Sequence, residues 1–457
     1  MHMPQKKPQT TNYKLKTKIK PELPGGFRDY GPEDAIARQK MIEKIRKTFE
    51  DFGFDPLETP AVERTEVLTD GEKDSGKIIF NLSSSAKELK SKDKSKISLR
   101  FDLTVPLARF LAGNPEIPKP FKRYQIGNVW RGESPQAGRY REFMQADIDI
   151  VGTSSMEADS EIVILIYRVF KNLGINNFLI NINNRKILNG LPKFAGFPEK
   201  KLSDALRIID KRDKIGEKEV AKELARAVGK KQTERIMQFL FLSGDAKQKL
   251  LGARELLKDT PSAEEGIKEL AEIVRNIRAA GVEERNWQIN FCTVRGLGYY
   301  TGPVFETVLT EAEELGSVFS GGRYDGLAEK FGQKISAVGV SAGIDRLFVA
   351  LDKLGATGHK KTTTRALILN LSPELKTDYF AFASELRKAG ISSSIYLGDD
   401  RAFQAQLAYA VKKEIPFVII YGDRDKEKNV VTVKNLVTRE QKEIPKDKLV
   451  EYIKNPK

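Results

Sequence analysis

Histidine and cysteine are almost absent from this chain of 457 residues, which contains two histidines and one cysteine. The single cysteine, Cys292, excludes an internal disulfide and any zinc site built from cysteine ligands. The only histidines are His2 and His359, so Ser-His-Asp and Cys-His catalysis and most histidine-ligated metal sites are excluded as well. Any chemistry must therefore depend on carboxylates, arginines, backbone amides and a cation such as Mg²⁺.

Long apolar runs are also missing, since no stretch approaches the roughly 20 residues needed to cross a bilayer. The first 20 residues hold six lysines but no acid, no arginine and no apolar core typical of a secretory signal. We therefore expect a basic flexible arm over residues 1–22 and a cytoplasmic location. A hydrophobic content of 40% and a charged content of 31% favour a soluble globular protein of two or three domains.

The charge is unbalanced, because 78 lysines and arginines face 63 acids and leave a net charge of +15. One interpretation is a lysine-rich surface that keeps the protein soluble. The other is a polyanionic partner such as nucleic acid. Composition leaves both open.

The first 150 residues combine a long helix with strands. Ile42, Ile45 and Phe49 recur at helical spacing, and Gly53 is a suitable stop for that helix. The run "KISLRFDLTVPLARFLA" predicts a short strand that leads into a helix, with Thr104 as its N-cap. The runs "FKRYQIGNVWR" and "YREFMQADIDIVG" predict an antiparallel pair of strands joined by a long Gly/Pro loop.

The rest of the chain changes character twice. Residues 190–285 are rich in lysine and glutamate at helical spacing, and they predict a helical insertion. Strands resume beyond it, and the small residues before "IDRLFVAL" predict a helix that begins at Ser341. A linker over residues 356–364 leads to residues 365–457, where alternating strands and helices predict a small α/β domain with partly parallel pairing.

The stretch "MQADIDIV" carries the clearest chemical pattern. Alternation with period two places Gln145, Asp147 and Asp149 on one face of a strand and apolar residues on the other. An amide and two acids on one face suit a cationic or amino-bearing ligand, although a solvent-facing edge strand would show the same pattern. Arg131 ends the preceding strand and could lie beside this face, where a guanidinium can bind a phosphate.

In order, these segments resemble class II aminoacyl-tRNA synthetases, most closely the histidyl-tRNA synthetase family. "GFRDYGPEDAIARQKMIEKIRKTFEDFGFDPLETPAVE", "VWRGESPQAGRYREFMQADIDIVG" and "AVGVSAGIDRL" resemble the three class II motifs, with Pro60 at the motif 1 proline. "RGLGYYTGPVFE" and "GGRYDGL" resemble the two histidine-specific motifs. The resemblance runs from about Pro24 to the C-terminus.

The resemblance implies an α+β fold with a class II catalytic domain over residues 23–355, built on an antiparallel sheet flanked by helices. It implies an anticodon-binding α/β domain over residues 365–457 and a helical insertion near the tRNA acceptor stem. The implied reaction activates L-histidine with ATP and Mg²⁺ to histidyl-adenylate and then transfers histidine to tRNA(His). Motif 1 builds the dimer interface in this family, so a homodimer is expected.

Specific residues match positions with known roles in the family. The positions that hold the histidine amino and carboxylate groups are Asp102, Thr104 and Gln145, and those that read or line the ring pocket are Asp149, Tyr299 and Tyr300. The ATP positions are Arg131 at the α-phosphate, Glu133 near the adenine and Arg346 at the γ-phosphate end. Gln136 matches a residue that faces the tRNA acceptor end, and Asp102 agrees with the eukaryotic-type motif "LRYDLT" rather than with the bacterial glutamate.

The stretch "RGLGYY" holds both the strongest match and the main departure. Arg295 matches the family arginine that contacts the ATP α-phosphate from the histidine side, so with Arg131 and Arg346 it completes the expected catalytic set. Gly298 stands where the family motif "RGLDYY" has an aspartate. That departure keeps an alternative open, a synthetase-like regulatory or RNA-binding protein without catalysis. The presence of residues 365–457 argues against the regulatory form, which usually lacks that domain.

Overall fold

A computed structural model describes residues 19–69, 79–83, 96–134, 140–294, 299–326 and 329–456. Most of the expected basic arm lies outside these residues. Three predicted positions, Gln136, Arg295 and Gly298, also lie outside them.

The larger part of the protein is built on an eight-stranded sheet with the order β1-β5-β6-β11-β10-β9-β7-β8. Pairing is antiparallel from β5 through β7, and only the short outer strands β1 and β8 pair in parallel. The strands are β1 (Asp55–Pro56), β5 (Phe121–Trp130), β6 (Glu142–Val151), β7 (Phe178–Asn184), β8 (Trp287–Ile289), β9 (Pro303–Leu309), β10 (Phe319–Tyr324) and β11 (Ala337–Gly343).

The two faces of this sheet differ sharply in polarity. On the back, an apolar row that includes Ile148, Val340, Phe305 and Ile182 crosses the paired strands. On the front, register places seven polar residues in one row across seven strands: Gln125, Asp147, Ser341, Ser320, Glu306, Asn181 and Gln288. Because side chains alternate along each strand, the residues next to the apolar row face the front of the sheet. A complete row of polar residues there indicates that the front serves a polar function.

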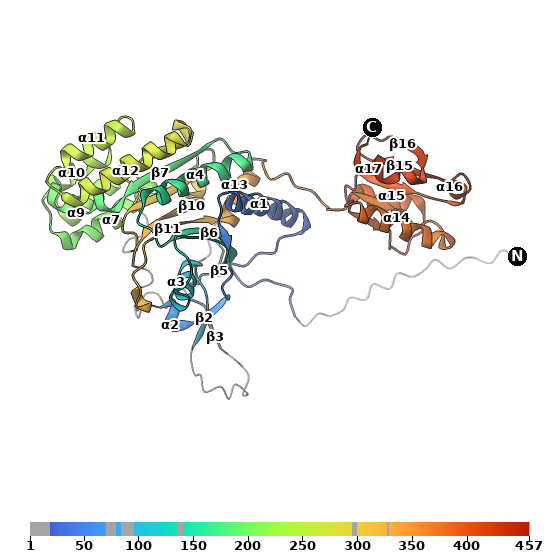
Figure 1. Cartoon of the computed structure of the whole chain (residues 1–457), viewed down its shortest axis with the longest axis horizontal. Helices are drawn as coiled ribbons and strands as arrows, with labels where there is room; N and C mark the ends of the chain where they lie inside the picture. Colours follow the sequence, from blue (N-terminus) through green and yellow to red (C-terminus); the bar gives the residue numbers. More distant parts are fainter. Residues whose placement is uncertain are drawn as a thin grey trace.

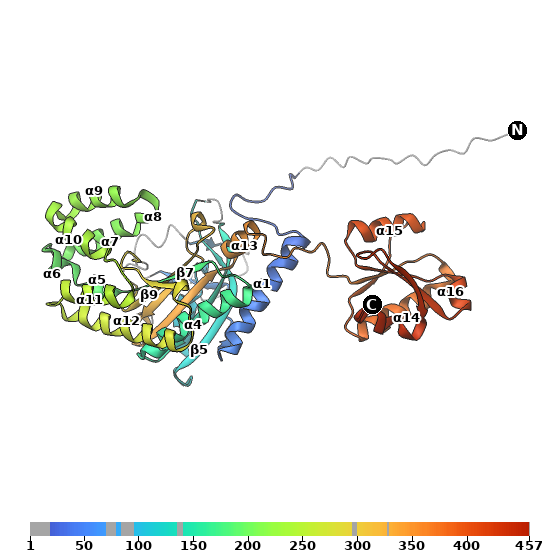
Figure 2. The same ribbon diagram turned by 90° about the horizontal axis from the view of Figure 1, so that it is seen from above.

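Long amphipathic helices cover the apolar back of the sheet, as Figures 1 and 2 show. They are α1 (Pro32–Asp51), α4 (Met156–Leu173), α12 (Pro261–Ala279) and α13 (Ile344–Lys353), and α4 packs between α1 and α12. Ser155 caps α4 by accepting a hydrogen bond from the Glu157 amide, and Gly174 ends it at a φ of 82°, which favours glycine. These helices and the sheet share one core.

A group of helices lies at one end of the sheet (Figure 1). It consists of α5 (Arg185–Leu188), α6 (Leu191–Ala195), α7 (Leu202–Asp210), α8 (Arg212–Ile215), α9 (Glu217–Val228), α10 (Lys230–Leu240), α11 (Ala246–Leu256) and α12. Asp245 and Gln248 form a reciprocal capping box at the start of α11. The apolar residues of this group join the main core, so it is continuous with the sheet.

A small antiparallel sheet, β2-β4-β3, lies beyond the polar front of the main sheet (Figure 1). Its strands are β2 (Val62–Arg64), β3 (Asn81–Leu82) and β4 (Ile97–Leu99), and it adjoins α2 (Thr65–Leu68) and α3 (Thr104–Gly113). Thr104 is the first residue of α3 and not its N-cap, which is Leu103. The Asp102 carboxylate takes over the capping contact by accepting a hydrogen bond from the Val105 amide at 3.1 Å.

The C-terminal part is a separate five-stranded sheet with the order β13-β12-β14-β15-β16, joined to the rest by an extended segment (Figure 2). The first three strands of this order pair in parallel and the last two in antiparallel fashion. The elements are β12 (Ala366–Ile368), α14 (Lys376–Lys388), β13 (Ser393–Ile395), α15 (Phe403–Lys412), β14 (Phe417–Ile420), α16 (Asp423–Glu427), β15 (Val430–Asn435), β16 (Gln441–Pro445) and α17 (Leu449–Lys454). Alternation along β12 places Ile368 in the core with α14 and Leu367 in the core with α15, so helices cover both faces.

The predicted α+β fold class is confirmed, with one local correction. Ser341 does not begin a helix, because β11 continues through Gly343 and α13 begins at Ile344. Small residues are compatible with either state, and pairing with β6 and β10 decides in favour of the strand. Across the described ranges, no helix is both long enough and apolar enough to cross a membrane.

Candidate active site

A cavity of about 40 Å³ opens on the polar front of the main sheet. We call it the sheet-face cavity. Its lining comes from strands β6, β10 and β11, from the start of α3 and from the segment before β9. The lining residues are Thr104, Asp147, Asp149, Tyr299, Tyr300, Ser320, Tyr324, Gly339, Val340 and Ser341. Residues that are far apart in sequence thus meet at one point, because β6, β11 and β10 pair in register and the other two segments lie against them.

Asp149 is held at the base of this cavity by two neighbours. Tyr324 donates a hydrogen bond to Asp149 Oδ1. Arg123, its register partner on β5, places Nη2 2.6 Å from Asp149 Oδ2. Burial raises the pKa of Asp149, while the Arg123 charge and the Tyr324 hydrogen bond oppose that rise. The two neighbours therefore favour the carboxylate form of this buried residue.

Asp147 lies two residues earlier on the same face and is less well compensated. Burial raises its pKa to about 7, with Arg123 lowering it and the charge of Asp149 adding to the rise. Within the described part of the chain, Asp147 Oδ1 has no hydrogen-bond partner. A buried carboxylate oxygen without a donor is costly, so this atom is suited to accept a hydrogen bond from a ligand.

Three tyrosines form one wall of the cavity. Tyr299 stacks on Tyr324 with ring centroids 5.3 Å apart, and it contacts Tyr300 edge-on at 5.1 Å. Burial raises the pKa of all three hydroxyls, so they are neutral hydrogen-bonding groups at physiological pH. A wall of aromatic rings beside two acids suits a small ligand that has a flat ring and N–H donors.

A matched profile for histidyl-tRNA synthetase covers residues 26–347, and one for an anticodon binding domain covers residues 365–456. The chain belongs to the histidyl-tRNA synthetase family. A histidine–tRNA ligase from Clostridium tetani is 39% identical over 445 residues, which is 96% of this chain and 99% of that protein. One from Paracoccus denitrificans is 39% identical and covers 93% of this chain and 92% of its own length. The crystal structure of histidyl-tRNA synthetase from Nostoc sp. PCC 7120 matches with a TM-score of 0.86 at 34% identity, covering 96% of this chain and 99% of that one.

The residues expected to bind histidine lie on or beside the sheet-face cavity. Thr104, Asp149, Tyr299 and Tyr300 line it directly. Gln145 lies on the same face of β6 and donates from Nε2 to Ser341 Oγ at 2.6 Å. Asp102 is close enough to raise the pKa of Tyr299 and Tyr300 by its charge, although burial is the larger cause.

The residues expected to bind ATP, Arg131, Glu133 and Arg346, do not line the cavity. Arg131 follows β5, donates from Nε to the Phe101 carbonyl at 3.0 Å and lies over the Phe143 ring at 4.9 Å. Glu133 is exposed on the loop beyond it. Arg346 lies in the first turn of α13 and donates from Nη1 to the Ser317 carbonyl at 2.5 Å.

Asp345, the neighbour of Arg346, fixes the start of α13 against the sheet. Its Oδ1 accepts hydrogen bonds from Tyr30 Oη at 2.6 Å and Arg38 Nη2 at 2.9 Å, and its Oδ2 accepts one from the Met144 amide at 2.6 Å. A buried carboxylate with three donors on three segments is a rigid anchor. Motif 1 and motif 2 of the histidyl-tRNA synthetase family are thereby tied to the helix that carries Arg346.

Sequence reasoning missed Arg123 and Tyr324, and it placed Asp147 on the ligand-binding face without assigning it a specific contact. Arg123 precedes Tyr124 in a lysine- and arginine-containing run, which is also typical of an exposed strand. Tyr324 lies within the quoted motif "GGRYDGL", so its proximity to a family motif was an available signal. The contacts of both residues depend on strand register, which a single sequence does not give.

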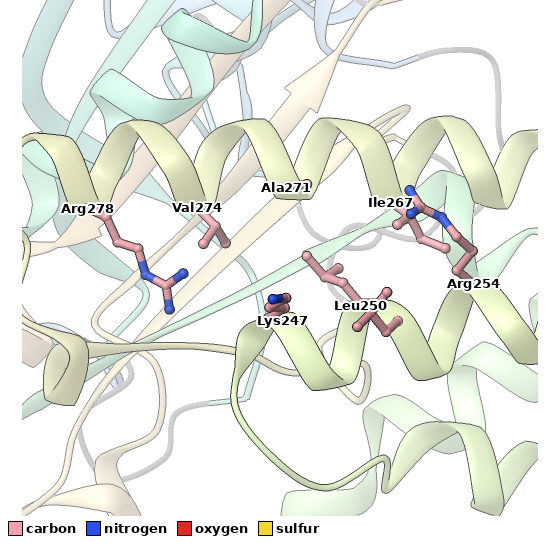
Figure 3. A pocket seen from close by; sticks show the side chains of 8 residues that line it. Lys247, Leu250, Arg254, Ile267, Ala271, Val274 and Arg278 are labelled. Carbon is pink, nitrogen blue, oxygen red and sulfur yellow. The ribbon is translucent and has the colours of Figure 1, made fainter.

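A larger hollow, of about 250 Å³, lies between α11 and α12 and is a different kind of surface (Figure 3). Its floor is apolar, with Leu250, Ile267 and Val274, and cationic side chains flank it. Arg254 and Arg278 form ion pairs with Glu264 and Glu284. No acid or tyrosine lines this hollow, so it lacks the groups expected at the active site of a histidyl-tRNA synthetase.

Proposed function

We propose that this chain joins L-histidine to tRNA(His) in two steps. Histidine and ATP first form histidyl-adenylate and pyrophosphate, and histidine then passes to the tRNA. Membership in the family and similarity over nearly the full length of histidine–tRNA ligases support the proposal. The structural observation that carries it is the sheet-face cavity, where two acids and three tyrosines converge. Because the match extends through the anticodon binding domain, a non-catalytic relative is not favoured.

In the first step, the polar front of the sheet would orient histidine. Asp102, Thr104 and Gln145 would hold its amino and carboxylate groups at the mouth of the cavity. Asp149 and Tyr300 would read the ring nitrogens, with Tyr299 as a wall. A site that hydrogen-bonds its substrate can reject analogues that lack the bonded group by large factors, because its own buried polar groups would be left without partners.

The chemical step is the attack of the histidine carboxylate on the ATP α-phosphate, which releases pyrophosphate. It requires little proton transfer but extensive neutralisation of phosphate charge, so positioning and electrostatics dominate. Arg131 and Arg295 would bind the α-phosphate, Arg346 the γ-phosphate end, and Glu133 would lie near the adenine. Arginine suits this role because its planar donors match phosphate oxygens.

Mg²⁺ would accompany ATP. Among the described residues, no three or more histidine, cysteine, aspartate or glutamate side chains are grouped to hold a metal ion. The phosphates of ATP would supply most of its ligands, as is usual for this ion. Bound there, Mg²⁺ would neutralise phosphate charge.

Transfer would use the other parts of the chain. Residues 365–457 would bind the anticodon, a role that the matched anticodon binding domain supports. The helical insertion would lie near the acceptor stem, Gln136 would face the acceptor end, and the net charge of +15 would favour a polyanion. We further propose a homodimer, and the exposed apolar side chains of the small sheet, Val62, Leu82 and Ile97, support it. We also propose a cytoplasmic location.

Charging of tRNA tests the whole proposal. Purified protein with ATP, Mg²⁺ and a tRNA pool is expected to attach labelled histidine and no other amino acid. Asp149→Asn should raise the KM for histidine about tenfold or more, because a neutral amide replaces a charged acceptor, and should leave the KM for ATP nearly unchanged. Equal effects on both constants would refute the ring-reading role of Asp149.

A further inference from the structure

Among the described residues, Arg123 is the largest of the fully buried side chains, with 0% of its side chain exposed. It lies on β5 and points to the front of the sheet, toward Asp149. Its Nη2 also donates to the Leu103 carbonyl at 3.3 Å. Within the described ranges, Nε and Nη1 have no hydrogen-bond partner. A guanidinium has five N–H donors, so this arginine is strongly under-satisfied for a buried cation.

A second buried arginine shows what a purely structural pair looks like in the same sheet. Arg323 lies on the back of β10 and pairs with Asp159 of α4. Its remaining donors reach the Thr153 and Ser155 carbonyls at 2.9 and 3.0 Å and Ser336 Oγ at 3.0 Å. The donors of Arg323, on the apolar back of the sheet, thus have hydrogen-bond partners, whereas Nε and Nη1 of Arg123, on the front that faces the cavity, have none among the described residues.

The geometry of the Arg123 pair leaves one acceptor atom open. Nη2 is close to Asp149 Oδ2, but Oδ2 accepts no hydrogen bond from any described residue. Tyr324 occupies Oδ1 instead. The carboxylate is therefore fixed by one hydrogen bond and one charge contact, and Oδ2 retains the capacity to accept an N–H from a ligand in the cavity.

The charges around Asp149 support the same role for Arg123. Asp147 and Asp149 both lie close to Arg123, and the charge of Arg123 lowers the pKa of both. Arg100 interacts electrostatically with Asp147 as well. Without Arg123, burial and the repulsion between two nearby carboxylates would favour the protonated form of Asp149 more strongly. The arginine thus permits an acceptor of full charge where burial alone would favour a neutral acid.

We propose that Arg123 is a positioning residue that determines histidine specificity by holding Asp149 ionised and oriented toward the ring nitrogen. This inference rests on the proposed ring-reading role of Asp149. Arg123 does not need to touch the substrate, because it acts through the carboxylate.

The test compares the full-length protein with Arg123→Leu and Arg123→Lys in histidine-dependent pyrophosphate exchange. Arg123→Leu is expected to raise the KM for histidine about 10- to 100-fold and to leave the KM for ATP nearly unchanged, as loss of a charge-assisted contact would do. Arg123→Lys keeps the charge and should recover part of that loss. Thermal unfolding of each variant shows whether it is folded.

Arg323→Leu is the matched control, since it removes a buried arginine of the same sheet from the opposite face. It should lower the unfolding temperature without changing the ratio of the two KM values. The proposal would be overturned if the ratio of the KM for histidine to the KM for ATP were similar in Arg323→Leu and Arg123→Leu. It would also be overturned if neither Arg123 variant folded, because Arg123 would then serve stability.

A double variant, Arg123→Leu with Asp149→Asn, tests the role of Arg123 separately from the ring-reading role of Asp149. If Arg123 acts through Asp149, the double variant should be little worse than Asp149→Asn alone. Fully additive losses would contradict the inference. If Asp149→Asn alone leaves the KM for histidine unchanged, the ring-reading role itself fails, whatever Arg123 does.

Discussion

Gly339 on β11 lies directly opposite Asp149 on β6, and a Cβ added at Gly339 would come within 2.1 Å of Asp149 Oδ1. The same Cβ would lie 2.7 Å from the Ile148 carbonyl, which is backbone and cannot move aside cheaply. Glycine at this position therefore makes room for the carboxylate at the base of the sheet-face cavity. The position of Asp149 depends on the strand opposite as well as on its own.

Gly339→Ala should accordingly displace the Asp149 carboxylate. We expect the KM for histidine to rise about tenfold or more, with a smaller effect on the KM for ATP, because the contact of a charged acceptor is lost. Gly113→Ala is the control, since its added Cβ meets nothing within 4 Å and Gly113 has no positive φ. If Gly339→Ala binds histidine as well as Gly113→Ala does, the spatial argument is wrong.

Asp147 predicts a dependence of stability on pH. Its folded-state pKa of about 7 lies above the usual 3.8, so between these values the folded protein retains a proton that the unfolded chain has lost. Stability should therefore fall as pH rises through this window. Asp147→Asn removes this titration, and its unfolding temperature relative to the parent should increase by at least about 2 °C from pH 5 to pH 8. A constant difference across that range would contradict the pKa assigned to Asp147.

The buried pair of Arg323 and Asp159 predicts non-additive stability. Arg323→Leu or Asp159→Leu alone leaves an uncompensated buried charge, and each should destabilise the protein by about 3–5 kcal/mol. The double variant removes both charges and should cost less than the sum of the two. Denaturant unfolding of the four proteins measures this, and strict additivity would show that the charges do not interact.

Arg295 and Gly298 lie outside the described residues, so their roles stay predictions from sequence. Arg295→Ala should abolish adenylate formation, because an arginine at the α-phosphate neutralises charge in the transition state. Gly298→Asp restores the usual family residue and should leave activity unchanged or raise it. Loss of activity in Gly298→Asp would mean that the glycine is a working part of the site.

The sequence predicted well wherever a local pattern decides the structure. Alternation in "MQADIDIV" placed Gln145, Asp147 and Asp149 on one face, and the pairing of β6 with β11 confirms that face. The antiparallel pair of β5 and β6 follows from two strand-like runs and a Gly/Pro loop. In each case the signal is complete within about ten residues.

What the sequence did not reveal depends on register and on long-range contacts. Ser341 belongs to a strand because β6 and β10 flank it, although its small neighbours are compatible with other states. Arg123 meets Asp149 only because two strands pair in one of several registers. Asp102, and not Thr104 as expected, caps α3, because its carboxylate accepts a hydrogen bond from the Val105 amide.

The sheet-face cavity is expected to select histidine for reaction with ATP. The most direct measurement is the exchange of labelled pyrophosphate into ATP with each of the twenty amino acids in turn. Exchange is expected with histidine alone. Exchange with a different amino acid, without any amino acid, or with none of the twenty would contradict it.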